Sequence, residues 1–207
     1  IIHLDYACGT GRILSLAENL TTESTGIDVS ENMISIARKK VKKAKMLVGD
    51  ISENDDILAP HYDVITLFRF ILNTEPSIRN KVMSSLVSHL RAPDGRLIFD
   101  IQGNRHSLRH LTIKLRPKHG ERINEMSYKD VRRLVEDCGL DIESWCGFGV
   151  LPPVLHRSWL DPLIRVLDNF FATLPLMKWV SYDLQFVCRH GGQVAGQHGE
   201  AKGEAPK

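Results

Sequence analysis

The sequence predicts an α/β fold built on a doubly wound, mostly parallel β-sheet. Short apolar segments of strand length alternate with helical patterns, and the order strand, helix, strand is repeated four times in a row. Parallel strands joined by right-handed helical crossovers give a sheet with helices on both faces. The chain has 207 residues, of which 43% are hydrophobic and 25% charged, and this suits one globular domain with a substantial core.

A turn of small residues joins the first strand to the first helix. Ile1 to Asp5 form a short apolar run that ends in an acid, and Ala7 to Gly11 form the turn. Apolar residues then recur at helical spacing over 13–20. A second strand ends at Gly26 to Val29, which completes the first strand–helix–strand unit.

Two more helices and two more strands follow. Ser30 is a good N-cap for the second helix, Lys45 to Val48 form the third strand, and Tyr62 to Phe68 form the fourth. Thr74 is expected to cap the next helix, because Pro76 then falls in its first turn. The apolar stripe of this helix consists of Ile78, Val82, Leu86 and Leu90.

The remaining patterns bring the sheet to seven strands. Arg96 to Ile101 form the fifth strand. Ser127, with Asp130 three residues later, has the spacing of a capping box and predicts the start of a helix. Leu140 to Trp145 and Tyr182 to Cys188 alternate like two further strands.

We expect residues 1–189 to form a single domain and 190–207 to be a disordered tail. Residues 151–180 are rich in proline and apolar side chains, and they predict a helical insertion before the last strand. This insertion suits a lid, a hydrophobic wall for a substrate, a contact with a partner subunit or a peripheral contact with a membrane. The chain opens on an apolar run without methionine, so we expect an upstream segment to have been removed.

The bulk composition limits the partners. Lys and Arg total 27 against 25 Asp and Glu, so the charge balance gives no case for nucleic acid. Four scattered cysteines, in no C-x-x-C pair, indicate reduced thiols of a cytoplasmic protein and no metal site. No apolar run reaches the roughly 18 residues that a transmembrane helix needs.

The turn after the first strand is the place to look for a ligand, since doubly wound sheets bind ligands at the carboxyl ends of their strands. Gly9 and Gly11 are followed by Leu14 where a dinucleotide fingerprint needs a third glycine, so that motif is incomplete. Two acids end the first two strands, Asp5 and Asp28. Small residues, helical N–H groups and two acids suit a ligand with a carboxylate, an ammonium group and a ribose.

The run Leu4 to Gly11 resembles the first motif of class I S-adenosylmethionine-dependent methyltransferases. Gly26 to Met33 resembles the ribose-binding segment of that family, and Gly49 to Ile51 its adenine loop. Tyr62 to Ile65 and Pro93 to Leu97 resemble the fourth strand and the turn into the fifth, so the resemblance covers residues 1–102. It implies S-adenosylmethionine as cofactor, and a last strand that runs antiparallel to the others.

The resemblance also implies which residues bind the cofactor. Asp5 lies near the methionine moiety in this family, Asp28 binds the ribose and Asp50 the adenine amine. Ala7 departs from the family, which usually has glycine there. The implied cofactor-binding residues are Asp5, Ala7, Cys8, Gly9, Gly11, Asp28, Val29, Met33, Asp50, Ile51 and Phe68.

Fewer sequence features indicate the methyl acceptor than indicate the cofactor. We expect the acceptor atom to be an oxygen or nitrogen of a small molecule, and the apolar insertion suggests a hydrophobic or lipid-like one. No residue is assigned as the catalytic base. The candidate acceptor residues follow the fourth and fifth strands and are Arg69, Asn73, Gln102 and His106. Two alternatives stay open: an RNA methyltransferase, because of the basic stretch from Arg105 to Arg122, and a non-catalytic scaffold that binds the cofactor.

Overall fold

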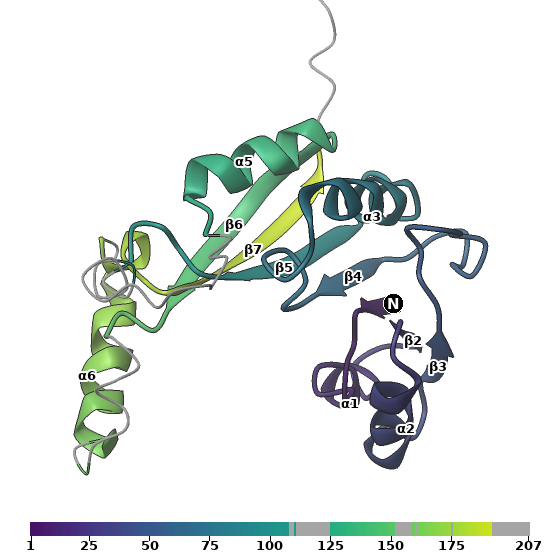
Figure 1. The fold of residues 1–207 in the computed structure, drawn as a ribbon, viewed down its shortest axis with the longest axis horizontal. Helices are drawn as coiled ribbons and strands as arrows, with labels where there is room; N and C mark the ends of the chain where they lie inside the picture. The colour runs from purple at the N-terminus through teal and green to yellow at the C-terminus, as the bar shows by residue number, and fades with distance from the viewer. Residues whose placement is uncertain (108–109, 111–124, 152–158, 160, 175, 192–207) are drawn as a thin grey trace, which may run out of the picture.

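The computed structural model describes residues 1–107, 110, 125–151, 159, 161–174 and 176–191. Its centre is one seven-stranded sheet (Figure 1). Six strands point the same way, and β7 is antiparallel to both of its neighbours, as predicted. The strands are β1 (Ile2–Tyr6), β2 (Glu23–Asp28), β3 (Lys45–Val48), β4 (Val64–Leu67), β5 (Arg96–Gln102), β6 (Leu140–Phe148) and β7 (Asp183–His190).

The strand order is β3-β2-β1-β4-β5-β7-β6. The chain runs outward from β1 to β3, returns to β4 on the other side of β1, and then runs outward the other way. The order therefore reverses between β1 and β4, which pair in parallel from His3 to Asp5. Crossovers leave such neighbouring strands in opposite directions, so a crevice opens at their carboxyl ends.

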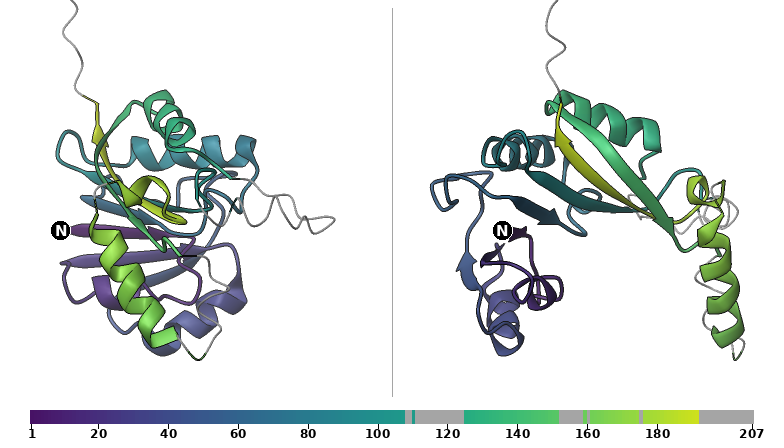
Figure 2. Two further views of the ribbon diagram at one scale, coloured as in Figure 1. Left: turned by 90° about the vertical axis from the view of Figure 1, so that its left-hand side faces the viewer. Right: turned by 180° about the vertical axis from the view of Figure 1, so that it is seen from behind.

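Helices cover both faces of this sheet. Helices α3 (Pro76–Ser88) and α5 (Tyr128–Asp137) lie on one side, while α1 (Leu14–Ala17) and α2 (Glu31–Lys40) lie on the other (Figures 1 and 2). Two of the three predicted caps are confirmed: Ser30 Oγ accepts the N–H of Met33, and Ser127 and Asp130 form the full capping box of α5. No helix among the described residues is long and apolar enough to cross a bilayer.

The expected cap of α3 was wrong by one residue. Glu75, and not Thr74, is the last residue before this helix, and it has the extended conformation with ψ 146°. Pro76 explains the difference, because its ring disfavours the helical conformation of the residue before it. Thr74 therefore lies before the helix, and it lines the cavity described below.

The described part of the insertion contains α6 (Asp161–Thr173) and the short 3-10 helix η2 (Met177–Trp179). Figure 1 shows α6 projecting away from the body of the sheet. Its apolar residues are largely exposed, among them Leu163, Val166 and Phe170 at 57%, 65% and 60%. Residues 152–158, 160 and 175 lie outside the described residues, and the role of the insertion as a lid, wall or contact stays a prediction.

Aromatic packing and one buried amide attach η2 to the sheet. The Trp179 ring lies 4.7 Å from that of Trp145 on β6 and 5.1 Å from that of Tyr128 on α5, centroid to centroid. Asn104 is 1% exposed, and its amide donates to the carbonyls of Trp179 and Ser181 at 2.7 and 3.0 Å. The end of β5 is thus fixed to the chain that enters β7.

The sheet extends slightly beyond the predicted bounds. β7 continues to His190, whose ring lies 3.0 Å from the carbonyl oxygen of Leu90, so His190 belongs to the folded domain and not to the expected tail. Residues 192–207 lie outside the described residues.

Glu18, at the end of α1, fixes the turn between α2 and β3. Its carboxylate accepts the backbone N–H groups of Lys42, Lys43 and Ala44 at 2.7–3.2 Å, and the residue is 8% exposed. Burial raises the pKa of Glu18, but the three backbone donors outweigh it, and the pKa lies below its usual range. Glu18 thus connects the end of α1 to the chain that enters β3.

Replacing Glu18 with Ala should lower the free energy of unfolding by about 2 kcal/mol, because it leaves three partly buried N–H groups without an acceptor. The depressed pKa means that this contribution is present above the unfolded pKa of about 4.3 and is lost as the pH falls through the folded one. Urea unfolding of the wild type and the variant at pH 7 and pH 4 measures both effects. Glu23→Ala, at an exposed position, is the control; an equal loss in both variants would contradict the role of Glu18.

Candidate functional site

A cavity of about 530 Å³ opens at the carboxyl ends of β1, β2 and β4, where the strand order reverses. Its volume lies within the range of small-molecule sites. The walls come from the turn after β1, the end of β2 with the start of α2, and the segment after β4. The residues that line it are Asp5, Tyr6, Ala7, Cys8, Gly9, Thr10, Arg12, Ile13, Asp28, Val29, Met33, Phe68, Arg69, Phe70, Asn73 and Thr74.

The carboxylate of Asp28 holds the glycine turn in place. Its Oδ2 accepts the N–H of Gly9 at 2.8 Å, and its Oδ1 accepts the N–H of Ser30 at 2.9 Å. The N–H of Cys8 donates to the carbonyl of Ile27 at 3.0 Å, which extends the β1–β2 pairing into the turn. Each carboxylate oxygen still has a second lone pair, so Asp28 can accept further hydrogen bonds from a ligand in the cavity.

Glycine is required in this turn by its conformation and, at Gly11, also by space. Gly9 and Gly11 have φ of 52° and 71°, in the left-handed region. A Cβ on Gly11 would lie 2.8 Å from Val41 Cγ2 and 3.0 Å from Ala37 Cβ, so the turn packs directly on α2. Ala7 has φ 55° without being glycine, at the position where the resembling family usually has one.

Asp5 is a buried acid at the base of the cavity. It is 2% exposed, and its Oδ1 accepts the hydroxyl of Thr66 at 2.7 Å. Its Oδ2 has no hydrogen-bond partner among the described residues. Burial raises the pKa of Asp5 to about 7, although the Thr66 hydroxyl and the backbone N–H of Leu14 oppose this. A cation in the cavity would stabilise the ionised form.

Aromatic side chains line the cavity beside these acids. The rings of Tyr6 and Phe70 meet edge to face, with centroids 5.7 Å apart. The Tyr6 hydroxyl donates to Asp50 Oδ1 at 3.4 Å, and burial raises the pKa of Tyr6 to about 12, so it is a neutral donor. Phe68, after β4, adds a further apolar wall.

On the β4 side, the backbone presents Arg69 to the cavity. Arg69 has φ 59°, a conformation that costs energy for any residue with a Cβ. Two hydrogen bonds hold it there: its N–H donates to Asp100 Oδ1 at 2.6 Å, and its carbonyl accepts the Asn73 amide at 2.5 Å. A strained residue that is fixed from both sides is typical of a functional position.

Most of the residues predicted to bind the cofactor line this one cavity; Gly11, Asp50 and Ile51 do not. Gly11 packs on α2, Ile51 is buried in the core, and Asp50 reaches the cavity only through the Tyr6 hydroxyl. Sequence reasoning did not assign Tyr6, Thr10, Arg12, Ile13, Phe70 and Thr74 to the site. Their proximity to the two strand ends was the available signal, since each lies within a few residues of an assigned position.

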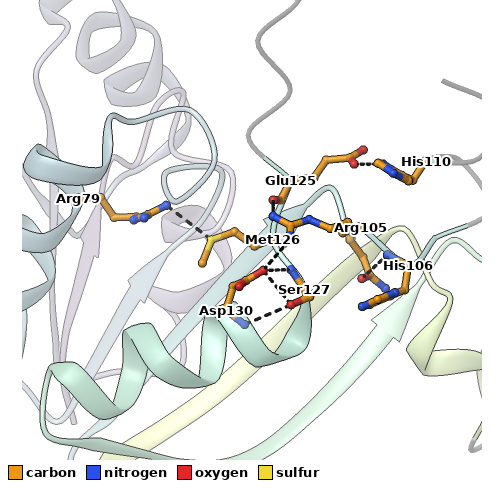
Figure 3. A network of polar contacts seen from close by, with 9 residues as sticks. Arg79, Arg105, His106, His110, Glu125, Met126, Ser127 and Asp130 are labelled. Carbon is orange, nitrogen blue, oxygen red and sulfur yellow. Dashed lines mark hydrogen bonds and ion pairs between the residues drawn. The ribbon is translucent and has the colours of Figure 1, made fainter. Parts of the chain in front are cut away.

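Two candidate acceptor residues, Gln102 and His106, do not line the cavity. Gln102 lies at the end of β5 opposite Asp183 of β7. The backbone N–H of His106 donates to Asn104 Oδ1 at 3.1 Å (Figure 3). Gln102 ends β5 and His106 follows it, and β5 is one strand further from the point of reversal than β4.

The described part of the basic stretch after β5 has structural partners. Arg105 pairs with Asp130 at 3.4 Å and donates to the carbonyl of Glu125 at 3.0 Å, next to the capping box of α5 (Figure 3). His110 contacts the carboxylate of Glu125. These contacts attach the connection before α5 to the end of β5. Most of the other basic residues of the stretch lie outside the described residues.

A seven-stranded sheet of this order, with a glycine turn and two acids at the reversal point, has the class I methyltransferase fold. Comparison with known families agrees: the model of a family described as a methyltransferase domain matches residues 1–144. The chain therefore belongs to this methyltransferase domain family.

Individual relatives are similar over the same region. A protein of Geobacillus sp. (strain WCH70), named as a candidate methyltransferase, is 34% identical over 106 residues, which are 47% of this chain and 41% of the relative. The dTDP-4-amino-2,3,4,6-tetradeoxy-D-glucose N,N-dimethyltransferase of Saccharopolyspora spinosa is 32% identical over 100 residues, 47% of this chain and 39% of the relative. The chain thus spans about two-fifths of the length of these curated relatives.

The fold has many solved neighbours. The magnesium protoporphyrin IX methyltransferase of Synechocystis PCC 6803, solved with bound SAH, superposes with a TM-score of 0.64. It is 16% identical, and the match covers 91% of this chain and 74% of that one. At this identity the likeness concerns the fold alone.

Replacing Gly11 with Ala should lower the free energy of unfolding by about 2–3 kcal/mol, since the new Cβ meets α2 in addition to the strained φ. Gly139→Ala is the matched control, because Gly139 has φ 74° but nothing within 4 Å of an added Cβ. The control should lose only about 1 kcal/mol from strain. Chemical denaturation of both variants measures the difference, and equal losses would show that the turn does not depend on close packing.

Proposed function

We propose that this chain binds S-adenosylmethionine in the cavity at the β1–β4 reversal and transfers its methyl group to a small acceptor. The observation that carries the proposal is the joint position of the glycine turn, Asp28 and Asp5 around one cavity. Membership of the methyltransferase domain family supports the reaction class.

The residues of the cavity fit this ligand group by group. Asp28 has free lone pairs for ribose hydroxyls, and Val29 and Met33 provide apolar surface beside it. The unpartnered Oδ2 of Asp5 suits the ammonium group of the methionine end. The bound cofactor would supply a methyl group activated by a sulfonium, and the chain would hold it in line with the acceptor.

We assign the acceptor to the β4 side of the cavity, next to Phe68 and Phe70. Arg69 and Asn73 provide polar contacts there, and Arg69 suits an acceptor that carries a carboxylate or phosphate. An oxygen or nitrogen atom receives the methyl group. The Saccharopolyspora relative is named for N,N-dimethylation, which supports a nitrogen. Positioning of the two reactants contributes most of the catalysis, and no side chain is assigned as the base.

Calorimetry with S-adenosylhomocysteine tests the cofactor. The wild-type chain should bind one equivalent, and Asp28→Ala should weaken binding at least tenfold, because it removes the ribose acceptor and loosens the turn. Asp137→Ala, on the exposed end of α5, is the control and should bind like the wild type. The absence of any binding heat for a wild-type chain that unfolds cooperatively would refute the proposal.

Transfer of a labelled methyl group to a metabolite extract tests the acceptor side. Arg69→Gly removes the side chain while suiting φ 59°, so the backbone should be retained. We expect this variant to bind S-adenosylhomocysteine normally but to transfer the methyl group at least tenfold more slowly at low acceptor concentration. Unchanged transfer would exclude Arg69 from acceptor recognition.

A further inference from the structure

A chain of buried hydrogen bonds leads away from Asp5 beneath the cavity. Thr66 on β4 connects two residues of β1: its hydroxyl lies 2.7 Å from Asp5 Oδ1 and 2.9 Å from His3 Nε2. His3, Asp5 and Thr66 are 1%, 2% and 6% exposed. His3 and Asp5 are two residues apart on one strand, so their side chains share a face of the sheet.

Because the Thr66 hydroxyl has a single proton, it couples the protonation of Asp5 to the tautomer of His3. When Asp5 is ionised, Thr66 donates to it, and His3 Nε2 must then carry a proton and donate to Thr66. When Asp5 is protonated, it donates to Thr66, and the Thr66 proton turns to His3 Nε2. The other acceptor within reach is the Leu4 carbonyl, which is more distant at 3.4 Å. The imidazole of His3 therefore follows the charge of Asp5.

The other ring nitrogen of His3 continues the chain toward the surface. Nδ1 lies 3.5 Å from Ser24 Oγ, which lies 2.6 Å from Thr21 Oγ1. Thr21 is partly exposed, and its hydroxyl donates to the Ala17 carbonyl at 2.9 Å. Hydroxyl and imidazole groups thus connect the buried Asp5 with the edge of the domain beside α1.

Burial keeps His3 neutral, and burial together with the charge of Asp28 gives Asp5 a pKa that a bound cation can lower. Burial lowers the pKa of His3 to about 4, so it is uncharged near neutral pH. Asp28, on β2, faces Asp5 and raises its pKa further, while Arg12 and Arg69 line the same cavity. Burial also raises the pKa of the Cys8 thiol, to about 12, so that it stays neutral.

We propose that His3 is a positioning residue for the cofactor, which acts through Thr66 to orient and ionise Asp5 when the cationic methionine end binds. This inference rests on the proposed function. On binding, one proton leaves Asp5 for Thr66, the Thr66 proton passes to His3 Nε2, and the Nδ1 proton passes through Ser24 and Thr21 to solvent. One proton is released in total, no covalent bond other than O–H and N–H bonds changes, and His3 ends as the opposite neutral tautomer.

Cofactor binding should therefore depend on pH in a defined way. The dissociation constant of S-adenosylmethionine should rise about tenfold for each pH unit below a midpoint near 7, since Asp5 must then lose a proton. Calorimetry in buffers of different ionisation enthalpy should find about 0.9 protons released at pH 6 and about 0.1 at pH 8, as a midpoint near 7 requires. A proton count that does not change between these pH values would overturn the inference.

Four variants and one control separate this role from a structural one. Thr66→Val removes the hydroxyl that donates to ionised Asp5. His3→Leu removes the N–H that donates to Thr66 when Asp5 is ionised, and lets the Thr66 hydroxyl turn to the Leu4 carbonyl instead. Each variant should therefore move the pH midpoint of cofactor binding up by about one pH unit. Thr66→Ser and His3→Gln keep a donor at the same place and should restore the wild-type midpoint. Thr25→Val makes the same change as Thr66→Val on neighbouring β2, outside the chain of hydrogen bonds, and should not move it.

The double variant His3→Leu, Thr66→Val should shift the midpoint no further than either single one, because both act on the same hydrogen bond. Additive shifts would show that the two residues act separately and would refute the coupling.

A measurement on the free protein keeps this inference separate from the proposed function. The ¹⁵N shifts of the His3 ring should change from the Nδ1–H to the Nε2–H tautomer as the pH rises, with the same midpoint as the ¹³C shift of the Asp5 carboxyl. Thr66→Val should abolish the link. A ring that keeps one tautomer across this titration would refute the relay even if the cofactor binds, whereas a coupled titration without cofactor binding would refute only the proposed function.

Discussion

The hydrogen bonds that Asp28 accepts are the constraint on which the site depends. One carboxylate at the end of β2 takes the N–H of Gly9 from the turn after β1 and the N–H of Ser30 at the start of α2. These bonds make two strand ends and a helix start into one rigid wall. The left-handed glycines and the contact of Gly11 with α2 become possible because the turn is held at this point.

The second half of the sheet supports this wall without contributing to it. Asp100 on β5 accepts the N–H of Arg69 and so holds the left-handed residue after β4. Asn104, just after the end of β5, joins β5 to the segment that enters β7. Residues of the second half therefore act on the site by fixing backbone, and the side chains that face the cavity come from the first 74 residues.

The sequence predicted the fold because its signals are local. Short apolar runs, the caps at Ser30 and Ser127, and the glycine turn each depend on a few neighbouring residues, and parallel crossovers leave few ways to connect them. The cofactor side of the site followed from the same turn. Gln102 and His106 were placed near the cavity only because they follow a strand, and distance from the reversal point could not be read from their spacing.

The hydrogen-bond chain through His3 shows more clearly what the sequence could not predict. In sequence, His3 is one polar residue within an apolar strand, and Thr66 lies 63 residues away. Their contact depends on the register of β1 against β4, which pairs Asp5 with Thr66. Strand register is a property of the folded sheet, so the contact between His3 and Thr66 could not be predicted from a local sequence pattern.

Ala7 and Arg69 are the two non-glycine residues with positive φ in the described part of the chain, and both line the cavity, on opposite sides of the reversal point. Each conformation costs about 1–2 kcal/mol relative to an ordinary one. These two costly backbone conformations thus both lie where the ligand would sit. Glycine at either position would relieve this strain, but it would also change the wall of the binding site, so the stability of the domain and the shape of the site are linked at these two residues.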